Sequence, residues 1–224
     1  MKKRLLDLFC KAGGAGQGYV DAGFEVVGVD IEPQKHYKAG EFVCMDAFEY
    51  LEKHGSDFDI IHASPPCKIF SQVQSIRGDR DTYKSKRIDL LTPMRVELIK
   101  LGKPYIIENV MGAKKVMKNP LMLCGTMFGL QVLRHRLFES NLPLHVWKLC
   151  KHNGTVANGE YMGVYGKGGK LWRNREAQER QLSSTSVADW RTAMGIDWMM
   201  RYEITQAIPP AYTKYLGKQA IRLL

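Results

Sequence analysis

The residue best suited to act as a nucleophile is Cys67, which follows two prolines at the end of a short apolar run. The run 59–63 predicts a buried strand, and Pro65 and Pro66 end it because proline donates no ladder hydrogen bond. Cys67 would then lie on a stiff turn at the carboxyl end of a strand, where open α/β sheets place their ligands. An inert turn cysteine fits the same residues, which alone leave the two interpretations about equal.

A second group with chemical potential is Glu108, at the end of another apolar run, 105–108. A thiolate beside a carboxyl group that can stay protonated suits attack on an electron-poor ring whose nitrogen gains a proton. In isolation, Glu108 is more typical of a capping or salt-bridged residue. Its value as a catalytic candidate therefore depends on the elements that would bring it close to Cys67.

The first 30 residues predict a nucleotide-binding βαβ unit. A strand at 4–9 leads into a glycine-rich run, 11–18, and a helix is expected over 16–22. The next strand, 25–29, ends at Asp30. Glycines allow a ligand to approach the backbone closely, and an acid after the second strand can accept ribose hydroxyls.

The rest of the chain continues this alternation of strands and helices, which predicts an α/β fold with a mostly parallel sheet and helices on both faces. The further elements expected are strands at 42–45, 59–63 and 105–108, helices at 47–53, 90–101 and 187–194, an antiparallel edge hairpin of 123–128 with 136–139, and a terminal helix after Pro209 and Pro210. We expect three regions, namely a catalytic and cofactor-binding core at 1–140, a small irregular insert at 141–186, and a segment returning to the core at 187–224.

Positive charge is concentrated in two segments that have little apolar periodicity. The 224-residue chain has a net charge of +10, and the segments 68–87 and 141–186 each carry +4. Clustered positive charge on loops beside a site suggests a polyanionic partner such as nucleic acid. The alternative is ordinary solvated surface charge.

The cysteines and the hydropathy indicate the compartment. Five widely spread cysteines do not suggest a disulfide framework, so we expect a reducing, cytoplasmic setting. No apolar run approaches the ~20 residues of a membrane span, and no signal peptide is evident. Cys150 and His152 lie close together, but two ligands do not make a zinc site, and no metal is expected.

Taken in chain order, these residues resemble the DNA (cytosine-5) methyltransferase family over nearly the whole chain. The motifs are a glycine loop, an acid, a Pro-Pro-Cys turn, and the sequences Glu-Asn-Val, Arg-His-Arg and Ala-Ile-Pro-Pro. They occupy 7–16, Asp30, 64–67, 108–110, 134–136 and 207–210, in the family order. The resemblance implies a Rossmann-like S-adenosylmethionine-dependent methyltransferase fold.

The resemblance also implies site residues. Those expected to hold S-adenosylmethionine are Phe9, Gly13, Gly14, Gly16, Asp30, Ile31, Asp46 and Pro65. Those expected in catalysis are Cys67, Glu108, Arg136, Arg134, Asn109 and Pro66, with Arg134 supporting the nucleophile loop. Those expected to contact DNA are Lys68, Ser71, Arg77, Lys84, Lys86, Lys167, Lys170 and Arg173.

The implied activity is methyl transfer to carbon 5 of a flipped-out cytosine in double-stranded DNA, by a protein that we expect to be monomeric. The chain departs from the family pattern at Lys68, Val132 and Gln206, where glutamine, glutamine and asparagine are usual. The alternatives are an RNA (tRNA) cytosine-5 methyltransferase, a catalytically silent DNA-binding module and, last, a dinucleotide-dependent oxidoreductase. The compact length resembles phage members of the family, which would suit protection of DNA from restriction.

Overall fold

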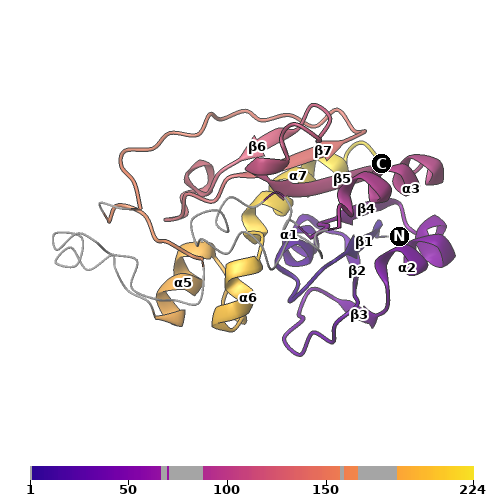
Figure 1. Ribbon diagram of the computed structural model, residues 1–224, viewed down its shortest axis with the longest axis horizontal. Coiled ribbons are helices and arrows are strands. Elements are labelled where there is room, and N and C mark those ends of the chain that lie inside the picture. The colour runs from indigo at the N-terminus through magenta and orange to yellow at the C-terminus, as the bar shows by residue number, and fades with distance from the viewer. Residues whose placement is uncertain (1, 67–69, 71–87, 157–158, 166–185) are drawn as a thin grey trace.

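The computed structural model describes residues 2–66, 70, 88–156, 159–165 and 186–224, and these form a seven-stranded sheet with helices packed against it (Figure 1). The strands are β1 (Arg4–Leu8), β2 (Glu25–Asp30), β3 (Glu41–Cys44), β4 (Ile60–Ala63), β5 (Tyr105–Val110), β6 (Leu121–Leu123) and β7 (Arg136–Ser140). Their order is β3-β2-β1-β4-β5-β7-β6. The five strands from β3 to β5 are parallel, whereas β7 runs antiparallel to both β5 and β6.

Helices cover both faces of the sheet. Successive strand residues point to opposite sides, and on the central strands the residues on both sides are apolar. Leu6 and Ile61 face the helices α2 (Ala47–His54) and α3 (Leu91–Leu101) in one buried apolar cluster. Their neighbours Leu5 and Ile60 face the helices α1 (Gly14–Ala22) and α7 (Pro210–Ala220) in another. The strands are thus apolar on both sides, as expected for a parallel sheet buried between helices.

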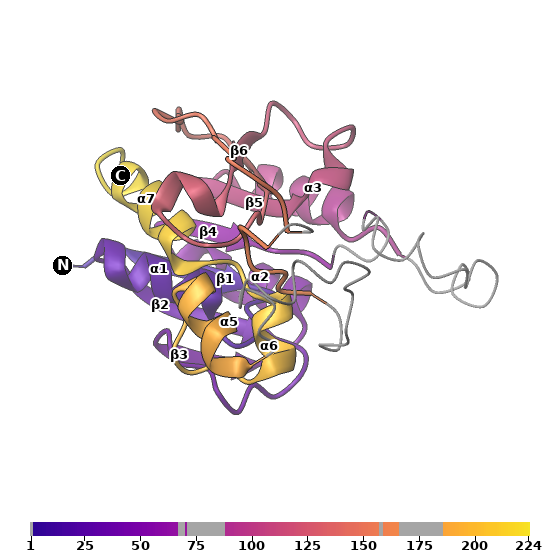
Figure 2. The same cartoon turned by 90° about the vertical axis from the view of Figure 1, so that its left-hand side faces the viewer.

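Two more helices, α5 (Val187–Met194) and α6 (Arg201–Gln206), form a third apolar cluster beside the sheet (Figure 2). Met162 and Val164 pack into this cluster, so the described end of the 141–186 segment contacts the C-terminal helices. Trp198 donates its indole N–H to the carbonyl oxygen of Ala12 at 2.9 Å. That bond connects the C-terminal region to the glycine loop.

The predicted fold class is confirmed, and one predicted element is wrong. The edge hairpin exists, but its first strand is β6 at Leu121–Leu123 rather than 123–128. Residues Gly125–Phe128 instead form a 3-10 helix, η5, which ends at Gly129 in the left-handed region, with φ 74°. A glycine in this conformation terminates helical turns readily because it has no Cβ.

The C-terminal helix begins at Pro210, as the two prolines predict, because proline suits the first turn of a helix. The boundaries of the three expected regions, 1–140, 141–186 and 187–224, stay predictions. Among the described residues, no helix is long and apolar enough to cross a membrane.

Candidate active site

The glycine loop follows β1 and lies against the last of the family-like motifs. Gly13 is in the left-handed conformation, with φ 80°, and precedes α1. A Cβ on Gly14 would lie 2.6 Å from the carbonyl oxygen of Ile208, so only glycine fits there. The loop and the motif at 207–210, far apart in sequence, are therefore in direct backbone contact.

Asp30 ends β2 beside this loop and is 3% exposed. Its carboxylate accepts the backbone N–H groups of Lys11 and Glu32, both at 3.1 Å, and the Lys11 ammonium lies 3.4 Å away. Lys11 also forms an ion pair with Glu32 at 3.0 Å. A ribose hydroxyl bound to Asp30 would therefore share the carboxylate with Lys11.

The other expected cofactor residues border the same end of the sheet. Asp46 caps α2 by accepting the N–H groups of Phe48 and Glu49 at 2.9 and 3.1 Å. The Phe9 and Phe48 rings meet edge to face, with centroids 6.3 Å apart. Ile31, beside Asp30, is 68% exposed and leaves an apolar surface open to a planar ligand. This set fits an adenosine-containing cofactor, since it combines a glycine loop, a ribose acceptor and an exposed apolar side chain.

Asp7 is buried beneath the glycine loop in β1. Burial raises the pKa of its carboxyl group to about 8, and the charge of Asp30 adds to this effect, whereas the backbone N–H of Gly16 opposes it. The Asp7 side chain is therefore mostly protonated at neutral pH in the folded protein.

Replacing Asp7 with asparagine is expected to stabilise the protein by about 4 kcal/mol at pH 7 and by less than about 1 kcal/mol at pH 4. In the unfolded chain Asp7 ionises above its ordinary pKa of 3.8, but in the folded protein it holds its proton until about 8. Folding then takes up a proton, and the free energy of unfolding falls with rising pH across this window, by about 1.4 kcal/mol per unit. Asparagine removes that dependence.

Urea unfolding of the wild type and Asp7→Asn at several pH values measures this difference. The matched control is Asp57→Asn, at an exposed aspartate whose substitution should leave the curve unchanged. An Asp7→Asn effect of equal size at pH 4 and pH 7 would show that folding leaves the pKa of Asp7 unchanged, which would contradict the prediction.

The turn before the candidate nucleophile is held by Asn109 at the end of β5. The fully buried Asn109 side chain donates to the carbonyl oxygen of Pro65 at 3.1 Å. Its own oxygen accepts the N–H of Val110 at 2.9 Å, which fixes the orientation of the amide. Pro65 is buried and Pro66 is exposed, so the chain emerges from the sheet at this point.

Several predicted site residues lie outside the described part of the chain. They are Cys67, Lys68, Ser71, Arg77, Lys84, Lys86, Lys167, Lys170 and Arg173. Phe70 is described, and its carbonyl oxygen would lie 1.9 Å from a Cβ on Gly112, so the backbone at Phe70 passes directly over that glycine. Residue 70 is thus packed beside the 3-10 turn η4 (Met111–Ala113), which follows β5.

Glu108 and Arg136 face one another on the adjacent strands β5 and β7. Arg136 Nε lies 2.9 Å from Glu108 Oε1, and the Glu108 carboxyl group is buried. Burial raises the pKa of Glu108, while the positive charges of Arg136 and Arg134 lower it. The structure therefore brings together two residues that the sequence predicts to act on one substrate.

Arg134 has other partners. Its guanidinium donates to the carbonyl oxygens of Val164 and Thr205, at 3.0 and 2.7 Å. These bonds connect the segment before β7 to the 141–186 region and to α6. Support of the nucleophile loop by Arg134 stays a prediction, because most of that loop lies outside the described residues.

No role was assigned from the sequence to three residues that lie near the site, namely Lys11, Tyr37 and His62. Lys11 contacts Asp30, and the Tyr37 ring would lie 3.0 Å from a Cβ on Gly13. His62, in β4, lies 3.0 Å from the Tyr19 hydroxyl and 2.8 Å from the Ser64 hydroxyl. Burial lowers the pKa of His62 to about 3, so it is a neutral structural residue. A histidine within an apolar run was the one visible hint.

The sheet and its helices define a Rossmann-like methyltransferase fold, and solved structures agree. A DNA modification methyltransferase encoded within an E. coli prophage is 14% identical, with a TM-score of 0.60 and 99% of each chain covered. The S. pombe Dnmt2 methyltransferase is 13% identical, with a TM-score of 0.61 over 100% of this chain and 99% of that one. The Entamoeba histolytica methyltransferase EhMeth is 13% identical, with a TM-score of 0.54 over 96% and 97%.

Sequence comparison identifies the family. The profile described as C-5 cytosine-specific DNA methylase matches residues 3–123, which is more than half of the chain. No curated protein matches the sequence. The protein belongs to the C-5 cytosine-specific DNA methylase family, as its motifs predict.

Proposed function

We propose that the protein transfers a methyl group from S-adenosylmethionine to carbon 5 of a cytosine in double-stranded DNA, through a covalent adduct with Cys67. The observation that supports this most is the buried Glu108–Arg136 pair, at 2.9 Å, beside the strand end from which the Pro-Pro-Cys turn emerges. The family match supports cytosine as the target base.

Glu108 and Arg136 suit two neighbouring polar atoms of a cytosine, N3 and the base carbonyl oxygen. The cytosine must first leave the duplex, because its ring face is unreachable when stacked. The Cys67 thiolate then forms a bond to carbon 6. Glu108 engages N3, where electron density develops, and Arg136 donates to the base carbonyl in a charge-assisted hydrogen bond.

The remaining bond changes restore the ring. Carbon 5 takes the methyl group that bound S-adenosylmethionine supplies, then loses its proton, and the bond between carbon 6 and the Cys67 sulfur breaks. Asp30, Gly13, Gly14 and Asp46 are the residues that would hold the cofactor. Asn109 positions the turn before Cys67 through its hydrogen bond to the Pro65 carbonyl.

DNA is the partner that we propose for the basic segments. Each of 68–87 and 141–186 carries a net charge of +4, and both border the candidate site in sequence. A prophage DNA modification methyltransferase is among the proteins of similar fold, which supports DNA as the substrate and protection from restriction as the role. RNA is the competing substrate.

Labelled S-adenosylmethionine with duplex DNA or with tRNA tests the proposal. We expect label in DNA, and Cys67→Ala should lower transfer at least about 10³-fold, because it removes the nucleophile. Cys44→Ala, at an exposed cysteine, is the matched control and should retain full activity. Label in tRNA alone would assign the protein to RNA, and an active Cys67→Ala enzyme would overturn the covalent mechanism.

A further inference from the structure

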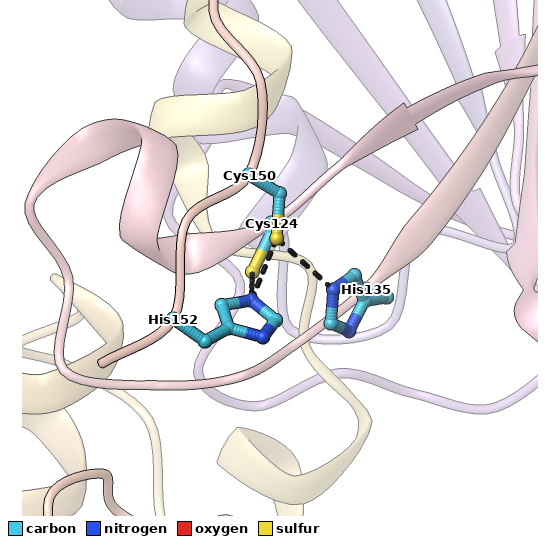
Figure 3. Close-up of side chains that lie close together, drawn as sticks. All are labelled: Cys124, His135, Cys150 and His152. Atoms are coloured by element: carbon cyan, nitrogen blue, oxygen red, sulfur yellow. Dashed lines mark hydrogen bonds between the residues drawn. The ribbon is translucent and has the colours of Figure 1, made fainter. Parts of the chain in front are cut away.

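A second group of reactive side chains lies at the sheet edge, apart from the Glu108–Arg136 pair. In the described ranges, Cys124, His135, Cys150 and His152 place four donor atoms within 4.8 Å of one another (Figure 3). The sequence shows only the last two as neighbours. The fold supplies the other two.

The register of the edge hairpin explains how the first two ligands meet. Leu123 in β6 pairs with Arg136 in β7, so the next positions outward are Cys124 and His135. Residues opposite one another on antiparallel strands have Cβ atoms about 5 Å apart. Cys124 and His135 therefore converge because of sheet geometry, not because of their spacing in sequence.

The other two ligands lie together on a largely exposed chain segment, whose backbone also donates to the hydroxyls of Tyr215 and Tyr161. Residues 147–149 and 151–153 are exposed, with Trp147 at 78% and Leu149 at 82%, whereas Cys150 between them is partly buried. So exposed a segment gains little stability from apolar burial. The Cys150 and His152 side chains nevertheless both point inward at the hairpin (Figure 3).

The distances between donor atoms are short enough for all four to reach one shared metal ion. Nε2 of His152 lies 3.3 Å from Cys124 Sγ and 2.6 Å from Cys150 Sγ, and Nε2 of His135 lies 3.3 Å from Cys150 Sγ. A tetrahedral zinc ion with ordinary bond lengths separates sulfur and nitrogen ligands by about 3.6 Å. Four groups directed at one point need only small movements to reach that geometry.

Surrounding groups also suit a metal with thiolate ligands. The Thr126 hydroxyl donates to Cys124 Sγ at 3.4 Å and lies 4.0 Å from Cys150 Sγ. Such outer hydrogen bonds orient sulfur ligands and stabilise their charge. Two thiolates and two neutral imidazoles also balance the charge of one divalent cation.

We propose that Cys124, His135, Cys150 and His152 bind a structural zinc ion. Four protein ligands of the Cys₂His₂ type form a closed tetrahedral site, which leaves no position open for substrate. The ion joins the start of the 141–186 segment to the sheet edge. It also holds His135, whose carbonyl oxygen accepts a hydrogen bond from Arg136 at 2.9 Å, and so steadies the backbone beside the catalytic arginine.

Metal analysis of the full chain, purified without chelator and without a histidine tag, tests this site. We expect about one zinc per chain in the wild type and less than about a tenth of that in Cys150→Ala and His152→Ala. Cys44→Ala and His54→Ala, at exposed residues away from the cluster, are the controls and should retain the metal. Equal zinc in all five proteins would place the metal elsewhere and overturn the assignment.

Cobalt substitution gives a readout that does not depend on folding of a variant. Wild-type protein reconstituted with Co²⁺ should show the intense visible bands of tetrahedral cobalt and a thiolate-to-cobalt charge-transfer band. Zinc should displace the cobalt, and removal of zinc should lower the melting temperature. A wild type that contains no zinc and gives only the weak spectrum of octahedral cobalt would refute the proposal.

Discussion

Replacing Glu108 with glutamine is expected to lower kcat for methyl transfer about 10³-fold, while the protein stays folded. Glutamine has the same shape and can still face Arg136, but it cannot exchange a proton with the cytosine ring nitrogen. Glu108 is 6% exposed, and burial raises its pKa against the opposing charges of Arg136 and Arg134, which favours proton uptake relative to an exposed glutamate. The Glu108→Gln substitution removes the ability to exchange a proton and leaves the shape of the side chain unchanged.

The melting temperature of the variant distinguishes a catalytic role of Glu108 from a structural one. Loss of the Glu108 charge removes a buried carboxyl group, so the melting temperature of Glu108→Gln should be equal to or above that of the wild type. Glu25→Gln, at an exposed glutamate, is the control for an uncharged substitution and should retain kcat. Full activity of Glu108→Gln would show that Glu108 only positions Arg136.

Replacing Arg95 with methionine is expected to destabilise the protein by about 4 kcal/mol. Arg95, in α3, donates two hydrogen bonds to the Glu139 carboxylate in β7, at 2.6 and 2.7 Å. Glu139 is 1% exposed and also accepts the N–H of Lys118 at 2.7 Å. Without Arg95, a buried carboxylate is left with no cation.

Denaturant unfolding of two further variants tests this explanation. Arg95→Met with Glu139→Leu should recover most of the loss, because an apolar pair leaves no unpaired charge. Lys100→Met, which breaks an exposed ion pair with Glu97 in the same helix, should cost less than about 1 kcal/mol. If the double variant were as unstable as Arg95→Met, lost packing would explain the effect instead of lost pairing.

The sequence predicted the elements whose signals are local. Continuous apolar runs predicted the parallel strands β1, β2, β4 and β5, because both faces of those strands are buried. The edge strand β6 was misplaced because it is short and because Cys124, Met127 and Phe128 look equally suited to a strand. Residues Gly125–Phe128 instead form a 3-10 helix that ends at Gly129, and only the backbone conformation shows it.

The candidate site was predicted to the extent that its residues lie at or near the carboxyl end of a strand. Asp30 ends β2 and Glu108 lies two residues before the end of β5, and the carboxyl ends of parallel strands share one edge of the sheet. The contacts of the site residues with other parts of the chain could not be predicted from this rule. Lys11 beside Asp30 and the backbone acceptors of Arg134 depend on how loops cross the sheet edge.

The fold class, the glycine loop with its acid, and the family could all be predicted from the amino-acid sequence, because each depends on short runs of neighbouring residues. The contacts between distant side chains, in contrast, depend on the three-dimensional fold. Strand register brings Cys124 opposite His135, and the folded 141–153 segment adds Cys150 and His152. Such contacts depend on register and on chain path, neither of which can be read from residue spacing, and so the proposed zinc site becomes visible only in the folded protein.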